Sequence, residues 1–291
     1  MTVYLNGRFL PVEEAQVSVM DRGFLFGDGV YEVIPVYSRQ PFRLAEHLRR
    51  LQASLDGIRL PNPHAAQEWA ALIERMVGLG ATDDQSVYLQ VTRGPSAVRN
   101  HAFPKAATPT VFMMGEPLAT PTDEQRRDGV SALSAADIRW LRCDLKTTSL
   151  LANCLLRQQA IDAGCIETVL FRDGILTEGA AANIFAIRNG ALLAPKKDHR
   201  MLPGITYDVI LELAATHGLP VEIRDVREDE VRAVDELWLT SSTREVLPIV
   251  RLDGQPVGHG INAGRPGPEF ARMHGWYQEF KRTVMRNSAI P

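Results

Sequence analysis

Four short stretches of the chain carry residue types that could do chemistry. Lys146 follows an apolar, strand-like segment and precedes an expected helix, which places its amine near a strand end, where sites tend to form. The ordinary alternative is a solvated surface lysine. Glu178 is followed by a row of small residues, Gly179 to Ala182, and such a row lets a flat group approach the backbone closely. Its alternative is a glutamate at the end of a hairpin.

The other two stretches suit an anion. Gly204-Ile205-Thr206 opens an expected helix, and the free N–H groups at a helix start bind phosphate. Thr206 could equally be a plain N-cap. Thr240-Ser241-Ser242-Thr243 is a hydroxyl cluster directly after an apolar strand, and it could hold a phosphate or merely cap the next segment.

Several familiar motifs are missing from the sequence. Gly23, Gly27 and Gly29 do not match the dinucleotide fingerprint, because no βαβ frame follows them. The seven histidines are scattered without metal-ligand spacing, so no metal site is expected. No GxSxG element is present.

The first part of the chain predicts strands, two helices and a long loop. Val3–Leu5 and Arg8–Leu10 flank Asn6-Gly7, a favoured hairpin turn. Arg93–Pro109 has no apolar periodicity and is expected to be a long functional loop. The other expected elements are a loop over Asp21–Gly29, a strand over Val30–Tyr37, helices over Leu44–Gly57 and from Pro63 to about Leu79, and strands near Ser86–Thr92 and Thr110–Gly115.

The second part predicts further strands, several of them adjacent in the chain. Glu116–Asp128 is expected to be a linker, which gives a domain 1–118 and a domain 119–291 that carries Lys146. Expected strands lie near Val130–Ala135, Glu167–Arg172, Asn183–Ile187, Ala191–Ala194, Val221–Val226 and Leu237–Thr240, with helices after Gly204 and from Pro268 to about Met285. This pattern favours an α+β fold. The tail Met285–Pro291 is expected to be disordered.

Composition narrows the class of protein. The 291 residues include 32 Lys and Arg against 35 Asp and Glu, a formal charge of −3, and 45% are hydrophobic. These values are typical of a globular chain and argue against nucleic-acid or membrane partners. No apolar run approaches the roughly 20 residues of a membrane span, and no signal peptide is evident. Three cysteines without a CxxC pair favour a reducing cytoplasm.

One ordered set of residues runs along the chain: Tyr31, Glu32, Arg50, Arg99, Asn100, His101, Asp137–Trp140, Lys146, Glu178, Asn183 and Gly204–Thr206. In this order they resemble the class IV aminotransferases, which are pyridoxal 5'-phosphate (PLP) enzymes of fold type IV, and most closely their D-amino-acid branch. The resemblance covers roughly Tyr4 to Phe280. It implies two domains, a smaller N-terminal α/β domain and a larger C-terminal one with a barrel-like β core.

The resemblance implies a role for each cofactor residue. Lys146 would form the Schiff base with PLP and then move the substrate's α-proton. Glu178 would pair with the pyridine nitrogen and favour the protonated ring. Arg50 would bind the phosphate, and Arg139 would lie near the ring or the lysine. Ile205 and Thr206 would add N–H donors, and Ser242 a hydroxyl.

The resemblance also implies how substrate binds. Arg99, His101 and Tyr31 would clamp its carboxylate, a pattern that favours D-substrates, and Val33 would shape the pocket. In the family this loop reaches in from the other subunit, which implies a homodimer. The implied activity is ping-pong transfer of the amino group between D-amino acids, of the D-alanine and D-glutamate type, and 2-oxo acids.

Departures and alternatives remain at this stage. Pro195 stands where the family usually has Thr, and Tyr207 where it has Arg or Lys, both beside the expected phosphate cup. The alternatives are a branched-chain L-amino-acid or (R)-amine transaminase, an aminodeoxychorismate lyase on the same fold, and a non-catalytic binding protein that retains the pocket.

Overall fold

The computed structural model describes residues 1–106 and 108–287. By its internal contacts the chain forms two compact units. The first comprises Met1–Leu118, Leu145–Leu150 and the chain from Met285 on; the second comprises Ala119–Asp144 and Leu151–Val284. Lys146 therefore groups with the first unit, not with the second as expected from its place in the chain. The reason is local: its backbone bonds to a strand and a helix of the first unit.

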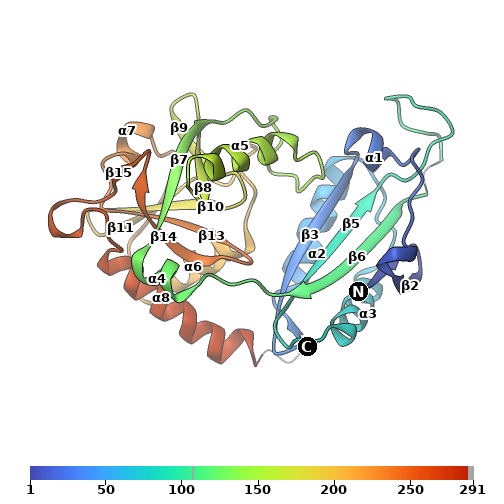
Figure 1. The fold of residues 1–291 in the computed structure, drawn as a ribbon, viewed down its shortest axis with the longest axis horizontal. Coiled ribbons are helices and arrows are strands. Elements are labelled where there is room, and N and C mark those ends of the chain that lie inside the picture. Colours follow the sequence, from blue (N-terminus) through green and yellow to red (C-terminus); the bar gives the residue numbers. More distant parts are fainter. Residues whose placement is uncertain (107, 288–291) are drawn as a thin grey trace. The chain divides into compact units, whose positions relative to one another are not determined.

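The first unit is an antiparallel six-stranded sheet in the order β2-β1-β6-β5-β3-β4. Its strands are β1 (Thr2–Leu5), β2 (Arg8–Pro11), β3 (Gly29–Tyr37), β4 (Gln40–Pro41), β5 (Gln85–Thr92) and β6 (Thr110–Pro117). Helices α2 (Leu44–Gly57) and α3 (Ala66–Leu79) cover one face (Figure 1). Leucines at helical spacing in α2 pack on β3, as the sequence predicts.

The second unit is a curled, mixed sheet in the order β12-β11-β10-β13-β14-β7-β8-β9, with β15 on the edge of β14. Its strands are β7 (Val130–Ala136), β8 (Glu167–Arg172), β9 (Ile175–Gly179), β10 (Asn183–Arg188), β11 (Ala191–Ala194), β12 (Val221–Ile223), β13 (Glu236–Ser241), β14 (Glu245–Leu252) and β15 (Gln255–Pro256). Its helices are α4 (Asp123–Asp128), α5 (Leu151–Asp162), α6 (Ile205–Thr216), α7 (Glu228–Val231) and α8 (Pro268–Phe280), which runs into a π-helical turn, Lys281–Met285. The core lies inside the curl.

Several expectations about elements are wrong. The loop expected over Asp21–Gly29 contains a short helix, α1 (Arg22–Phe26), because Asp21 caps it and Gly27 ends it at φ 64°. The linker expected over Glu116–Asp128 holds α4, capped by Thr122. The segment before Lys146 forms no strand after β7 ends at Ala136.

The tail from Met285 was expected to be disordered, and for residues 285–287, which the structure describes, this expectation is wrong. Met285 is fully buried, and the guanidinium of Arg286 bonds to the Asp84 carboxylate. Residues 288–291 of that expectation lie outside the described residues. Among the residues that the structure does describe, no helix has both the length and the apolar character needed to cross a membrane.

Candidate active site

Lys146 is fixed through its backbone. Its amide nitrogen donates to Ser54 Oγ at 3.1 Å, and its carbonyl oxygen accepts from the Tyr31 amide at 2.9 Å. Helix α2 supplies the first partner and strand β3 the second. The Lys146 Nζ atom lies 4.2 Å from the centroid of the Tyr31 ring, and the side chain is half-buried. An amine held over an aromatic face is positioned but still reachable.

A buried charge cluster lies on the same two elements. The Arg50 Nε and Nη2 atoms each donate to the Glu32 carboxylate at 2.8 Å, and His47 Nδ1 lies 2.8 Å from Glu32 Oε2. Burial alone would raise the pKa of Glu32, but the charge and hydrogen bonds of Arg50, with His47, hold it far below its usual range. The sequence predicted Arg50 as a phosphate ligand and gave no role to Glu32 or His47.

In the second unit, Glu178 is the last but one residue of strand β9 and is buried. The Arg139 Nη1 atom donates to Glu178 Oε1, and the same guanidinium binds the Asp137 carboxylate twice, at 2.8 Å each. Burial raises the pKa of Glu178, and the partly shared charge of Arg139 does not fully offset it. Arg139 thus contacts the expected ring-binding carboxylate directly, and Asp137 orients Arg139.

The Glu178 carboxylate is tied to the start of helix α6. Glu178 Oε2 accepts from the Leu202 amide at 3.2 Å and from Asn183 Nδ2 at 3.3 Å. Asn183 Nδ2 also donates to the Leu202 carbonyl at 3.0 Å. Gly204 is the N-cap of α6, and a Cβ there would lie 2.0 Å from Asn183 Oδ1. The lack of a Cβ at Gly204 thus lets the helix start lie directly against the Asn183 side chain.

The helix start has donors available for an anion. Gly204 offers no side-chain cap, so Thr206 is not the N-cap; with Ile205 it opens the first turn, whose N–H groups have no partner inside the helix. On strand β13, Thr240 pairs with Asn183, and its buried Oγ1 has no hydrogen-bond partner among the described residues. Ser242 follows that strand and is half-buried.

The expected carboxylate-binding loop belongs to the first unit. Arg99 and His101 are exposed there, and both pack on Phe26: the Arg99 Cζ atom lies 5.1 Å, and the His101 ring 5.3 Å, from its ring centroid. Tyr31 and Val33 are two residues apart on β3 and share one face of the strand.

Each unit thus carries part of the expected site. The first holds Tyr31, Val33, Arg50, Arg99, His101 and Lys146; the second holds Arg139, Glu178, Ile205, Thr206 and Ser242. Sequence reasoning named Asp137 and Glu32 but gave neither a role, and it missed the contacts by which Asp137 holds Arg139 and Glu32 holds Arg50.

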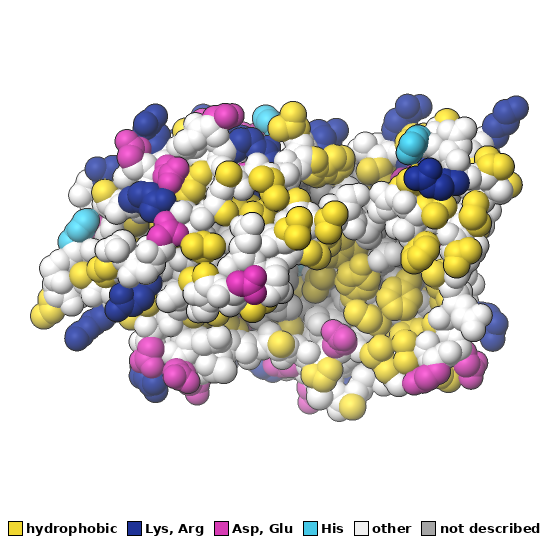
Figure 2. All heavy atoms as spheres, turned by 45° about the horizontal axis from the view of Figure 1, so that its top comes forward, with side chains coloured by type: hydrophobic (Ala, Val, Ile, Leu, Met, Phe, Trp, Pro, Cys, Tyr) yellow, Lys and Arg dark blue, Asp and Glu magenta, His cyan; other side chains and the backbone are white. Residues whose placement is uncertain are grey.

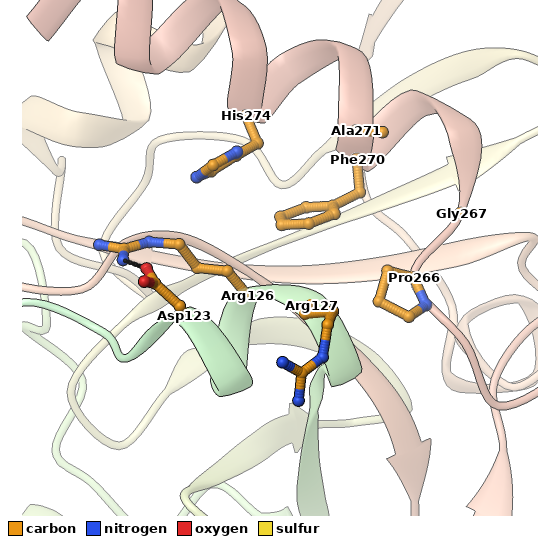
Figure 3. Close-up of a pocket in the computed structure, with 8 residues that line it drawn as sticks. All are labelled: Asp123, Arg126, Arg127, Pro266, Gly267, Phe270, Ala271 and His274. Atoms are coloured by element: carbon orange, nitrogen blue, oxygen red, sulfur yellow. Dashed lines mark hydrogen bonds and ion pairs between the residues drawn. The ribbon is translucent and has the colours of Figure 1, made fainter.

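The second unit also has a pocket of ≈ 410 Å³ between α4 and α8 (Figure 3). Arg126 and Arg127 border it from α4, and Phe270 and His274 from α8. It includes no residue that the sequence predicts for the active site.

Comparisons with a family model and with known proteins agree on one family. Residues 29–252 match the family model described as amino-transferase class IV. D-alanine aminotransferase from Bacillus licheniformis is 39% identical over 268 residues, 92% of this chain and 93% of that protein. The corresponding enzyme of Listeria innocua is 36% identical over 280 residues, 96% of each chain.

Solved structures show the same fold. The T.th. branched-chain amino acid aminotransferase with pyridoxamine 5'-phosphate has a TM-score of 0.85 at 26% identity, covering 96% of this chain and 93% of that one. The branched-chain amino acid aminotransferase from Escherichia coli has a TM-score of 0.85 at 23% identity, covering 99% and 95%. The curled sheet and the smaller N-terminal unit are thus those of fold type IV, as the sequence predicts.

Proposed function

The chain belongs to the class IV aminotransferases, which use PLP, and from that membership we propose that it transfers amino groups between D-amino acids and 2-oxo acids. D-alanine, D-glutamate and their oxo acids are the proposed substrates. One observation carries the choice of the D-series: the 39% identity to a D-alanine aminotransferase over 92% of the chain. The Arg99 and His101 pair supports it.

The residues present fit PLP. Thr240 Oγ1, which is buried and finds no hydrogen-bond partner within the described part of the chain, and the open first turn of α6 suit a phosphate. Burial raises the pKa of Glu178, and a protonated ring nitrogen beside it would favour the charged form of this carboxyl group. We propose that Lys146, Arg50, Ser242 and the amides of Ile205 and Thr206 hold the cofactor, with Glu178 at the ring nitrogen. The two residues that depart from the family pattern, Pro195 and Tyr207, contact each other: the Tyr207 hydroxyl donates a hydrogen bond to the Pro195 carbonyl at 2.7 Å.

When bound, PLP supplies a ring that accepts the electron pair left at the substrate's α-carbon. In our proposal, Lys146 Nζ would move the substrate's α-proton to the cofactor in one half-reaction and would carry a proton back to the α-carbon in the other. The Glu178 carboxylate holds the proton on the ring nitrogen. Arg139 favours the charged form of that carboxylate and orients it, and Asp137 fixes Arg139.

Substrate selection is assigned to the loop and β3. The Arg99 guanidinium with the His101 and Tyr31 side chains would bind the substrate carboxylate, because a fork of N–H donors matches its two oxygens. Fixing the carboxylate on one side decides which α-hydrogen faces Lys146. Val33, on the same face of β3 as Tyr31, would limit the side-chain pocket.

We also propose a homodimer in which this loop serves the partner's site. Large apolar side chains reach the surface of both units, some on the face in Figure 2; Phe24 is 72% and Leu151 75% exposed. Exposed apolar groups of this size are typical of interfaces. Cytoplasmic location remains a proposal, consistent with three free thiols, Cys143, Cys154 and Cys165.

The test of the catalytic assignment is Lys146→Ala. We expect the purified variant to lose the visible absorption of covalently held cofactor and to lose turnover by about 10³-fold or more. The matched control is Lys197→Ala, a lysine that pairs with Asp208 on the surface. Retained absorption and turnover in Lys146→Ala would refute the assignment.

The runner-up is a branched-chain L-amino-acid transaminase, favoured by the fold neighbours. Single-turnover spectra with D-alanine and with L-leucine separate the two. We expect D-alanine to convert the bound cofactor to its amine form at least tenfold faster. Conversion by L-leucine alone would establish the runner-up.

A further inference from the structure

The loop that carries Arg99 and His101 is held by a buried arginine to which no role has yet been given. Arg22 is the first residue of α1, and its side chain is only 4% exposed. Its Nη1 atom donates to the carbonyls of Asn100 at 2.5 Å and Ala102 at 3.3 Å. Its Nη2 atom donates to the His101 carbonyl at 3.1 Å.

Three consecutive carbonyls therefore converge on one guanidinium. A planar fork with several N–H donors suits this arrangement, and a lysine ammonium does not reproduce it. Because the carbonyls belong to residues 100–102, the contacts fix the backbone on either side of the His101 side chain and directly after Arg99. A loop without apolar periodicity is otherwise held by few contacts.

The guanidinium is itself held in place. Arg22 Nε donates to Asp28 Oδ2 at 2.7 Å, and Arg93 Nε donates to the same oxygen at 2.8 Å. Burial opposes ionisation of Asp28, but hydrogen bonds and charge from Arg93 and Arg22 outweigh it and lower its pKa. Arg93 also covers the loop residue Phe103, with its Cζ atom 3.7 Å from the ring centroid.

We propose that Arg22 is a positioning residue for substrate: it fixes the loop so that Arg99 and His101 meet the carboxylate without a cost for ordering them. The inference rests on the proposed function of that pair. Arg22 contacts the loop backbone through its guanidinium, so its loss should weaken binding of the carboxylate and leave the chemistry at Lys146 intact. Preorganisation of this kind acts on affinity.

The experiment compares Arg22→Gln with Arg39→Gln in the holoenzyme. Arg39 is a matched control in the same unit, because it also pairs with an aspartate, Asp83, and donates to two backbone carbonyls, those of Val77 and Gly80. For Arg22→Gln we expect amide hydrogen exchange across residues 96–106 to rise about tenfold. The KM for D-alanine and for the 2-oxo acid should rise roughly tenfold with kcat within about threefold. Arg39→Gln should change none of these.

A second variant guards against misfolding. Arg22→Lys keeps the charge but loses the fork, and we expect an intermediate KM with the bound-cofactor absorption unchanged. Arg22→Gln should raise KM by a smaller factor in an Arg99→Ala background than in the wild type, because there Arg22 can act only through His101.

Three results would overturn the inference. The first is unchanged amide hydrogen exchange of the loop in both Arg22 variants. The second is faster amide exchange in the Arg22 variants with a normal KM, although Arg99→Ala raises the KM. The third is a normal KM in Arg99→Ala itself. That third result alone would show that the proposed carboxylate clamp had failed, and Arg22 would lose its role with it.

Discussion

At the scale of single residues, two buried carboxylates behave in opposite ways. Glu32 faces a guanidinium that binds both of its oxygens, and its pKa is held low. Glu178 shares the Arg139 guanidinium with Asp137, and burial raises its pKa. Glu32 is thus a satisfied ion pair, whereas Glu178 has room for one more positive charge. In the proposed site, a protonated ring nitrogen would supply that charge.

The first prediction concerns Glu178→Gln. An amide cannot favour the protonated ring, so we expect cofactor to stay bound while kcat falls by about 10²–10⁴-fold. The matched control is Glu236→Gln, another buried carboxyl of the second unit whose pKa burial raises and which accepts the amides of Glu269 and Phe270. It should lower stability without changing kcat per bound cofactor. Equal kcat values for the two variants would contradict the role of Glu178.

The second prediction concerns Glu32→Gln and pH. Removing one partner of a buried ion pair leaves Arg50 uncompensated, so unfolding free energy at pH 7 should fall by roughly 3–5 kcal/mol. The folded pKa of Glu32 lies below the ordinary value of 4.5. Its contribution is therefore complete above about pH 4.5 and is lost as the pH falls toward the folded pKa.

The measurement is urea unfolding of both proteins between pH 7 and pH 3. The difference in unfolding free energy between wild type and Glu32→Gln should become smaller below about pH 4.5, by up to about 1.4 kcal/mol per pH unit. Glu74→Gln, on the exposed side of α3, serves as the control. A gap that stays constant down to pH 3 would contradict the ion-pair account.

At the scale of elements, hydrogen bonds among Glu178, Asn183 and Leu202 join the end of β9, the start of β10 and the segment before α6. Gly204→Ala tests their fit. The φ of −68° at Gly204 is one that alanine adopts freely, so the change acts through the added Cβ, which would lie 2.0 Å from Asn183 Oδ1 and 3.3 Å from Tyr207 Cβ. We expect a loss of about 1–3 kcal/mol in stability. The Kd for PLP should rise about tenfold, because Asn183 also holds Glu178.

The control for this prediction is Gly275→Ala in α8, where an added Cβ meets no atom within 4 Å. That variant should gain about 0.5–1 kcal/mol from helix propensity and keep its PLP affinity. Thermal unfolding and cofactor titration measure both effects. Unchanged stability and affinity in Gly204→Ala would show that the helix start is not tightly packed on Asn183.

Much of the fold could be predicted because local patterns decided it. Asn6-Gly7 and Asn189-Gly190 both form hairpin turns with positive φ, and the leucines of α2 follow helical spacing. Strand β14 was missed because Pro248 interrupts its apolar run. The proline is tolerated since pairing with β7 begins only at Ile249. Long-range pairing of this kind leaves no local pattern.

The site could be predicted as a set of residues but not as a set of contacts. Lys146 and Glu178 stand out by type and neighbours. By contrast, the pairing of Arg50 with Glu32 joins a helix to a strand 18 residues earlier, and the Arg22 contacts join residues about 80 apart. Such contacts depend on tertiary packing, which spacing within one element does not reveal.

At the scale of the whole molecule, the chain crosses between its two units several times, and one crossing places Lys146 with the first unit. Leu155 of α5 and Val98 of the loop are both more than half exposed. Exposed apolar groups of this kind suit burial in a symmetric dimer, where the same surfaces meet twice.

The last prediction tests whether the loop serves the partner's site. Lys146→Ala and Arg99→Ala are each expected to be defective, but they lie on different sides of the proposed shared site. When the two are co-expressed with different tags and the mixed dimer is isolated, one of its two sites would combine an intact lysine with an intact loop. At low substrate concentration the mixed dimer should therefore regain about half of wild-type activity.

The controls are the two parent homodimers, which should stay inactive under the same conditions, and sedimentation of each species, which establishes the dimer. If the loop served its own chain, each chain of the mixed dimer would carry one defective part, and no site would be complete. Activity no higher than the mean of the two parents would then exclude a shared site. Sedimentation would also reveal a failure of the variants to form dimers, which would therefore not be mistaken for a failure to complement.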